Sequence, residues 1–238
     1  SVSGADLEAV RALVASERAD RTPSLPTVLA QEDDWGGLAE ARATNLASGS
    51  VTIAFDAPGK ESLTEVIEAL RAAVTDADQD LVVVTPFFVP SDADVRWYGQ
   101  LVERGVRLRV LSNSLASNEG TISNSGLNRQ RLALLEAGVE LYELRTDAAA
   151  KRDWETSPSV ARYLGLHAKL YVIDRASVFL GSVNLDPRSK FVNTEMGVHV
   201  ENAELAKVAA DAIVKLMKPE NAWQVVIGSD GRPWWRND

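Results

Sequence analysis

The segment LHAKLYVIDRASVFLGSVNLDPRS gathers residue types that can act on a phosphate ester. His167 and Lys169 are two residues apart, Asp174 follows five residues later, and a Gly-Ser-x-Asn sequence ends at Asn184. An imidazole can serve as a nucleophile or a general acid, and an ammonium and a carboxamide can bind phosphoryl oxygens as charge develops on them. This spacing predicts a phosphate-handling site built around one histidine.

The alternation along a strand would place His167, Lys169 and Tyr171 on one face. The same pattern is typical of a half-exposed strand whose polar side chains face water, and on these residues alone both interpretations stand. The downstream residues favour a site, because Ser182 and Asn184 share a face of the next expected strand and can converge with the first pair on one anion. We therefore expect Lys169, Ser182 and Asn184 to bind phosphate.

Glu195, in the sequence NTEMG, begins a further expected strand. Its carboxylate can accept the second ring N–H of His167 and so fix the tautomer of that imidazole, as the acid of a catalytic triad does. The sequence offers no cluster of metal-ligand type, and we expect neither a metal nor a cofactor.

The elements that must position these residues follow an alternating βα pattern. Strands are expected over residues 51–57, 81–85, 106–114 and 139–144, with helices over 60–77, 92–104 and 127–137 between them. Three closely spaced strands (165–174, 177–183 and 194–202) and a helix (203–218) come next. The sequence thus predicts an α/β fold over residues 51–238. Residues 1–50 show helical spacing over 5–18, then two proline breaks and a polar segment over 31–50, and are interpreted as a lead-in or inter-domain connector.

Composition narrows the class of protein. The chain has 238 residues with 45% hydrophobic content, enough for one sizeable domain. Cysteine is absent, which excludes disulfides and thiolate metal sites. The net charge of -9 disfavours a nucleic-acid partner. Residues 145–175 are locally basic, with six Lys/Arg against four Asp/Glu, and lead into the predicted site.

These motifs resemble the phospholipase D superfamily, whose signature is His-x-Lys-x4-Asp followed by Gly-Ser-x-Asn. Every position is present: His167, Lys169, Asp174, Gly181, Ser182 and Asn184. The resemblance implies a layered mixed β-sheet flanked by helices, with one such motif in this half. It implies catalytic roles for His167, Lys169, Asp174 and Glu195: the histidine as phosphoryl nucleophile or acid, the glutamate as its orienter, and the aspartate mainly as a structural residue.

A narrower resemblance, over roughly residues 51–235, is to the C-terminal half of bacterial C-type cardiolipin synthases. Residues 1–50 are similar to the connector that follows the first half of those enzymes. One departure is that Asn124–Leu127 reads NSGL where those enzymes usually carry His-Ala-Gly-Tyr. That loop is expected near the substrate entrance, so the departure bears on headgroup specificity.

The resemblance implies phosphatidyl transfer through a phosphohistidine, with phosphatidylglycerol as one substrate and phosphatidylethanolamine as a partner, at the bacterial cytoplasmic membrane surface. A second histidine must then protonate the leaving alcohol and deprotonate the incoming one. His199 is the only other histidine, and it lacks the accompanying Lys and Asp. We expect the second histidine from a missing N-terminal half or a second subunit, and an uncovered apolar face where that partner packs.

Two alternatives remain open. One is a nuclease or phosphodiesterase homodimer of the same superfamily, and the other is a non-catalytic half-domain that completes another polypeptide. Residues 112–126, rich in Ser, Asn and Gly, are expected to form a loop, either a mobile one or one that lies over the site.

Overall fold

The computed structural model describes residues 48–57, 64–117, 121–150 and 165–237, without the side chains of 121–124. The predicted connector therefore lies outside the described residues, apart from 48–50. Most of the basic stretch before the predicted site, residues 151–164, also lies outside them. Within the described residues no helix is long and apolar enough to cross a membrane.

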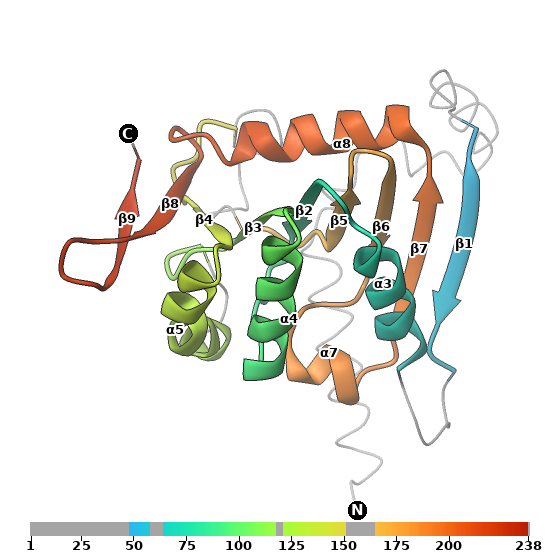
Figure 1. Cartoon of the computed structure of the whole chain (residues 1–238), viewed down its shortest axis with the longest axis horizontal. Helices are drawn as coiled ribbons and strands as arrows, with labels where there is room; N and C mark the ends of the chain where they lie inside the picture. The colour runs from blue at the N-terminus through green and yellow to red at the C-terminus, as the bar shows by residue number, and fades with distance from the viewer. Residues whose placement is uncertain (1–47, 58–63, 118–120, 151–164, 238) are drawn as a thin grey trace, which may run out of the picture. The chain divides into compact units, whose positions relative to one another are not determined.

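The described residues build one nine-stranded mixed sheet in the order β1-β7-β6-β5-β2-β3-β4-β8-β9 (Figure 1). The three central strands β2, β3 and β4 are parallel to one another, and every other pairing is antiparallel. The strands are β1 (Ser50–Phe55), β2 (Asp80–Val84), β3 (Arg107–Asn113), β4 (Glu140–Leu144), β5 (Leu170–Ile173), β6 (Ser177–Gly181), β7 (Met196–Glu201), β8 (Ala222–Ile227) and β9 (Pro233–Arg236).

Helices cover the two faces of this sheet and create two hydrophobic cores. The helices are α3 (Glu65–Thr75), α4 (Asp92–Glu103), α5 (Thr121–Glu136), α7 (Pro187–Phe191) and α8 (Ala203–Leu216). The first core joins α3, α4 and α5 to one face, and the second joins α8 to the other. Strand β2 is apolar on both faces and is therefore covered on both: Leu81 and Val83 enter the first core, and Val82 and Val84 enter the second. The α/β fold with helices flanking a mixed sheet is thus confirmed.

Local sequence signals set several helix ends. Ser91 and Asp94 form a capping box at the start of α4. Gly105 and Gly138, which directly follow the predicted helices 92–104 and 127–137, have φ values of +100° and +83°, a conformation that glycine adopts without strain.

The predicted loop over residues 112–126 is wrong at its C-terminal end. Strand β3 ends at Asn113, within the predicted strand 106–114, but α5 begins at Thr121, six residues before the predicted start at 127. Packing of α5 explains the early start. Leu127 is buried in the first core, and a Cβ on Gly126 would lie 2.4 Å from Cγ1 of Val89. This glycine therefore allows close approach of α5 to the segment after β2.

The antiparallel meander β5–β6–β7 is the part of the fold that carries the predicted site. Leu170, the first residue of β5, pairs with Val84 at the end of β2, so the start of β5 lies at the carboxyl edge of the parallel strands. His167 and Lys169 come just before this strand, which is shorter than the predicted 165–174. The three predicted strands of the meander are otherwise present and adjacent.

Candidate active site

An open pocket at the end of the meander brings five of the six predicted site residues together. It is lined by His167, Lys169, Gly181, Ser182, Asn184, Asn193, Thr194, Glu195 and Met196. These residues come from the approach to β5, the end of β6, and the connection between β6 and β7. Asp174 is the predicted site residue that does not line this pocket.

Lys169 holds the imidazole of His167. Its Nζ donates to the backbone oxygen of His167 at 2.8 Å and lies 3.2 Å from Nε2 of the same residue. An ammonium has no lone pair, so this contact requires Nε2 to accept and leaves the ring proton of a neutral imidazole on Nδ1. In that tautomer Nε2 carries the lone pair that a nucleophile requires, and the lone pair is held by the Lys169 ammonium until that ammonium turns to another acceptor.

The Lys169 side chain is more buried than a half-exposed strand predicts, with a relative exposure of 9%. Burial lowers the pKa of its ammonium below the ordinary value of 10.5, and the nearby carboxylates of Glu195 and Asp186 only partly oppose that effect. The pocket thus holds a cation that is incompletely neutralised, which suits a phosphodiester.

This pKa shift predicts that anion binding weakens early on the alkaline side. The affinity of the chain for sulfate, whose charge stays constant in this range, should fall as the pH rises through a value below 10.5, because the ammonium loses its proton there. Titration followed by NMR or calorimetry measures this. The variant Lys169→Arg, which stays charged, should lack that alkaline decline. An unchanged affinity up to the ordinary lysine pKa would contradict the prediction.

Glu195 lies in the same pocket as His167, but its described hydrogen bonds go elsewhere. Its carboxylate accepts from Ser182 Oγ and, at 3.1 Å, from Asn193 Nδ2. Its backbone N–H donates to Asp56 Oδ2 at 3.0 Å. The expected direct bond to the ring of His167 is not among the contacts of the described residues, so the orienting role of Glu195 stays a prediction.

Sequence reasoning missed Asp56 and Asn193, which position Glu195. Asp56 is 4% exposed, and besides Glu195 it accepts from the backbone N–H of Val66 in α3. Nothing in the local sequence links positions 56 and 195, because the contact spans 139 residues. Asn193 offered a weak signal, since it stands two residues before the predicted acid.

Asn184 lines the pocket with an unsatisfied polar atom. Its Oδ1 is buried without a hydrogen-bond partner in the described part of the chain. Since a half-turn of the carboxamide exchanges oxygen and nitrogen, this position can present a donor to a phosphoryl oxygen. An unpartnered buried amide is costly unless something binds it, so Asn184 fits the predicted phosphate-binding role.

Asp174 lies at the opposite end of β5 from Lys169. Its carboxylate accepts the backbone N–H groups of Asp78, Gln79 and Asp80 at 2.9, 2.8 and 2.9 Å. Burial raises its pKa, but the three donors outweigh that effect and the pKa lies below its ordinary value. These contacts tie the β5–β6 turn to the start of β2, in keeping with the structural role that the family resemblance implied.

Asp174→Ala should therefore destabilise the fold without touching the pocket. We expect a loss of about 2 kcal/mol, because two of the three N–H donors can turn to water. The contribution is present above the unfolded-state pKa near 3.8 and is lost as the pH falls through the lower folded-state value. Urea unfolding at two pH values measures it. The control Asp78→Ala removes an exposed carboxylate but keeps its N–H, and an equal loss in that control would contradict the prediction.

His199 lies outside the pocket. It sits in β7 between Thr52 of β1 and Phe179 of β6, and its ring centroid is 6.4 Å from that of Phe179. Among the residues that the structure describes, no cluster of His, Cys, Asp or Glu could hold a metal ion.

A family model described as "Cardiolipin synthase, PLD-like domain" matches residues 70–217. Cardiolipin synthase C of Escherichia coli (strain K12) is 36% identical over 156 residues, which are 64% of this chain and 32% of that protein. Cardiolipin synthase A of Serratia proteamaculans is 29% identical over 190 residues, 77% of this chain and 34% of that protein. The chain thus spans about a third of the length of these curated relatives.

Two solved structures share the fold. The phospholipase D family member Nuc from Salmonella typhimurium superposes with a TM-score of 0.53 at 15% identity, over 79% of this chain and 99% of Nuc. Phosphatidylserine synthase from Haemophilus influenzae superposes with a TM-score of 0.50 at 18% identity, over 74% of this chain and 43% of that enzyme.

Proposed function

Since this chain belongs to the family of PLD-like domains of the cardiolipin synthase type, we propose that it is one half of a two-histidine site for phosphatidyl transfer between phospholipids. The observation that carries this proposal is the pocket itself. One histidine, one buried lysine and one asparagine with an unsatisfied side-chain oxygen line the same pocket.

In the proposed mechanism, His167 Nε2 attacks the phosphorus of a phosphodiester and forms a phosphohistidine, and the bond to the leaving alcohol breaks. Lys169 and Asn184 stabilise the oxygens on which charge develops. The incoming alcohol then attacks the phosphohistidine. Phosphatidylglycerol and phosphatidylethanolamine are the proposed lipid substrates, met at the surface of the bacterial cytoplasmic membrane. The residues require neither a metal nor a cofactor for these steps.

The leaving alcohol needs a proton, and we assign its donor to a second histidine outside this chain. His199 is not among the residues that line the pocket, so we do not assign this role to it. The second histidine belongs to an N-terminal half of the same gene product or to a second subunit.

An exposed apolar surface beside the pocket supports this arrangement. Val51, Ile53 and Phe55 of β1 are 57%, 62% and 63% exposed in the structure. Phe55 pairs with Met196, which is itself 55% exposed and lines the pocket. Such a surface next to a site is suited to cover by a partner.

The test compares this chain, as a demonstrated monomer, with the same chain joined to or mixed with its partner half. The paired form should make cardiolipin from phosphatidylglycerol and phosphatidylethanolamine, and the monomer should not. Robust synthesis by the monomer would overturn the two-histidine proposal. Cleavage of single-stranded DNA by a homodimer, with no lipid product, would favour the nuclease alternative.

A further inference from the structure

The connection between β6 and β7 carries much of the candidate pocket. Residues 182–195 supply Ser182, Asn184, Asn193, Thr194 and Glu195 to its lining. The centre of this segment is α7, a helix of five residues, of which Ser189 and Lys190 are buried.

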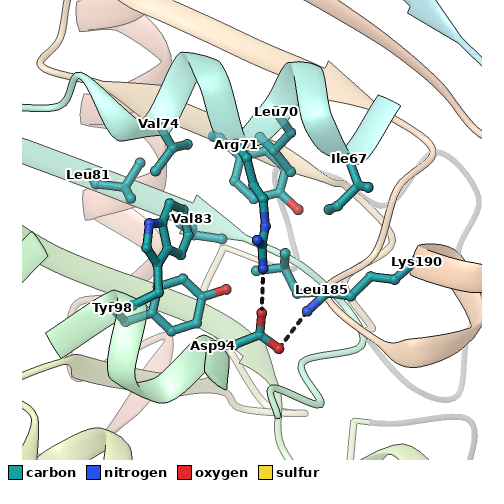
Figure 2. A pocket seen from close by; sticks show the side chains of 12 residues that line it. Ile67, Leu70, Arg71, Val74, Leu81, Val83, Asp94, Tyr98, Leu185 and Lys190 are labelled. Atoms are coloured by element: carbon teal, nitrogen blue, oxygen red, sulfur yellow. Dashed lines mark hydrogen bonds and ion pairs between the residues drawn. The ribbon is translucent and has the colours of Figure 1, made fainter. Parts of the chain in front are cut away.

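Lys190 reaches from α7 into the core and binds Asp94 of α4. The Nζ–Oδ2 distance is 2.6 Å, and the two side chains are 9% and 5% exposed. Figure 2 shows that Arg71 of α3 approaches the same carboxylate, at 3.3 Å. Ser91 donates to Asp94 from its N–H and its Oγ at 2.8 and 2.7 Å. Asp94 is thus a fixed anion at the start of α4.

Stability alone does not account for the Lys190 contact. A buried ion pair is often no more stabilising than apolar side chains of similar volume, because both charges must leave water. Asp94 already has partners in Ser91 and Arg71. The contact that Lys190 adds is the one that joins α7 to α4.

Two hydrogen bonds in series connect α7 to the pocket. Arg188 Nε donates to Asn193 Oδ1 at 3.2 Å, and Asn193 Nδ2 donates to Glu195 Oε1 at 3.1 Å. Both ends of the segment also have backbone anchors: Leu185 O accepts from Val89 at 2.8 Å, and Glu195 is bonded to Asp56 through its N–H and its backbone oxygen at 3.0 and 2.9 Å. Loss of the Lys190 contact would therefore act first on the side-chain contact between Asn193 and Glu195.

We propose that Lys190 is a positioning residue: by binding Asp94 it fixes α7 against α4 and, through Arg188 and Asn193, holds the Glu195 carboxylate in the pocket. The consequence for catalysis rests on the proposed function. The mechanical part of the proposal, that Lys190 fixes the position of Glu195, concerns this chain alone.

Hydrogen exchange of the intact chain tests the mechanical part. Lys190→Met keeps the length of the side chain and removes its charge. It should speed exchange of the Glu195 and Met196 amides, which donate to Asp56 and Ser182, by about tenfold or more. The matched control Arg71→Met removes the other cation on Asp94 without touching α7, and should change these rates by less than about twofold.

Equal rates in all three proteins, or equal acceleration in both variants, would overturn the proposal. If Lys190→Met does not fold, Lys190→Gln takes its place, because it keeps one neutral donor toward Asp94. It should give an intermediate acceleration at the same two amides, and wild-type rates in that variant would likewise overturn the proposal.

Activity of the paired form tests the catalytic consequence. Lys190→Met should lower kcat by about tenfold with little change in KM, because displaced groups cost rate more than binding, and Arg71→Met should leave both unchanged. Faster exchange with an unchanged kcat would overturn the link to catalysis. Absence of lipid transfer by the wild-type pair would instead refute the proposed function, and the exchange result would still decide the mechanical part.

Discussion

Replacing His167 by Asn is expected to lower phosphatidyl transfer by the paired form by about a thousandfold or more, because it removes the proposed nucleophile of the covalent route. The fold should be retained, since the His167 side chain is exposed. Its contacts with Lys169 are the ones that hold Nε2 toward the pocket, and asparagine cannot form a phosphohistidine.

Single-turnover reaction with a lipid labelled at phosphorus measures this effect. The wild type should give an acid-labile, alkali-stable label on this chain, and His167→Asn should give none. A phosphodiester with a nitrophenolate leaving group separates the two possible roles of the residue, because such a group leaves without a proton. Rescue by that substrate would assign His167 as the acid instead of the nucleophile. The control His199→Asn, a histidine outside the pocket, should retain transfer.

Lys169→Met is expected to lower the rate of the paired form by about a hundredfold or more, because the ammonium stabilises phosphoryl oxygens as charge develops. Methionine is preferred to alanine, since the side chain is 9% exposed and a truncation would leave a cavity. The control is Lys207→Met, which removes an exposed cation on α8. Steady-state kinetics and thermal unfolding of each variant measure the effect, and near-normal turnover with Met at position 169 would refute the role.

The meander β5–β6–β7 could be predicted from sequence because its signals are local. Short apolar runs, separated by turn residues, were enough to place three adjacent strands there. The start of α5 could not be predicted in this way. Its first residues are rich in Ser, Asn and Gly, which favour loops, but packing of Gly126 and Leu127 overrides that preference.

The site residues that belong to one sequence motif could be predicted. The residues that contact them from distant parts of the chain could not. His167, Lys169, Ser182 and Asn184 meet because adjacent antiparallel strands bring nearby residues to one edge. The contacts of Glu195 with Asp56, and of Lys190 with Asp94, span 139 and 96 residues. No periodicity or spacing reports such pairs, because they depend on which elements the fold places side by side.

The difference between contacts that are near and far along the chain also affects the order in which the chain folds. Asp174 and Arg175, both at φ +52°, make the tight turn by which Leu170 pairs with Leu180, only ten residues along the chain. The pairing of Leu170 with Val84 spans 86 residues and must close a much longer loop. Loop closure costs more entropy as the loop lengthens, and local contacts form faster. The hairpin that leads into the pocket is thus suited to an early step of folding, and its antiparallel pairing with β2 to a later one.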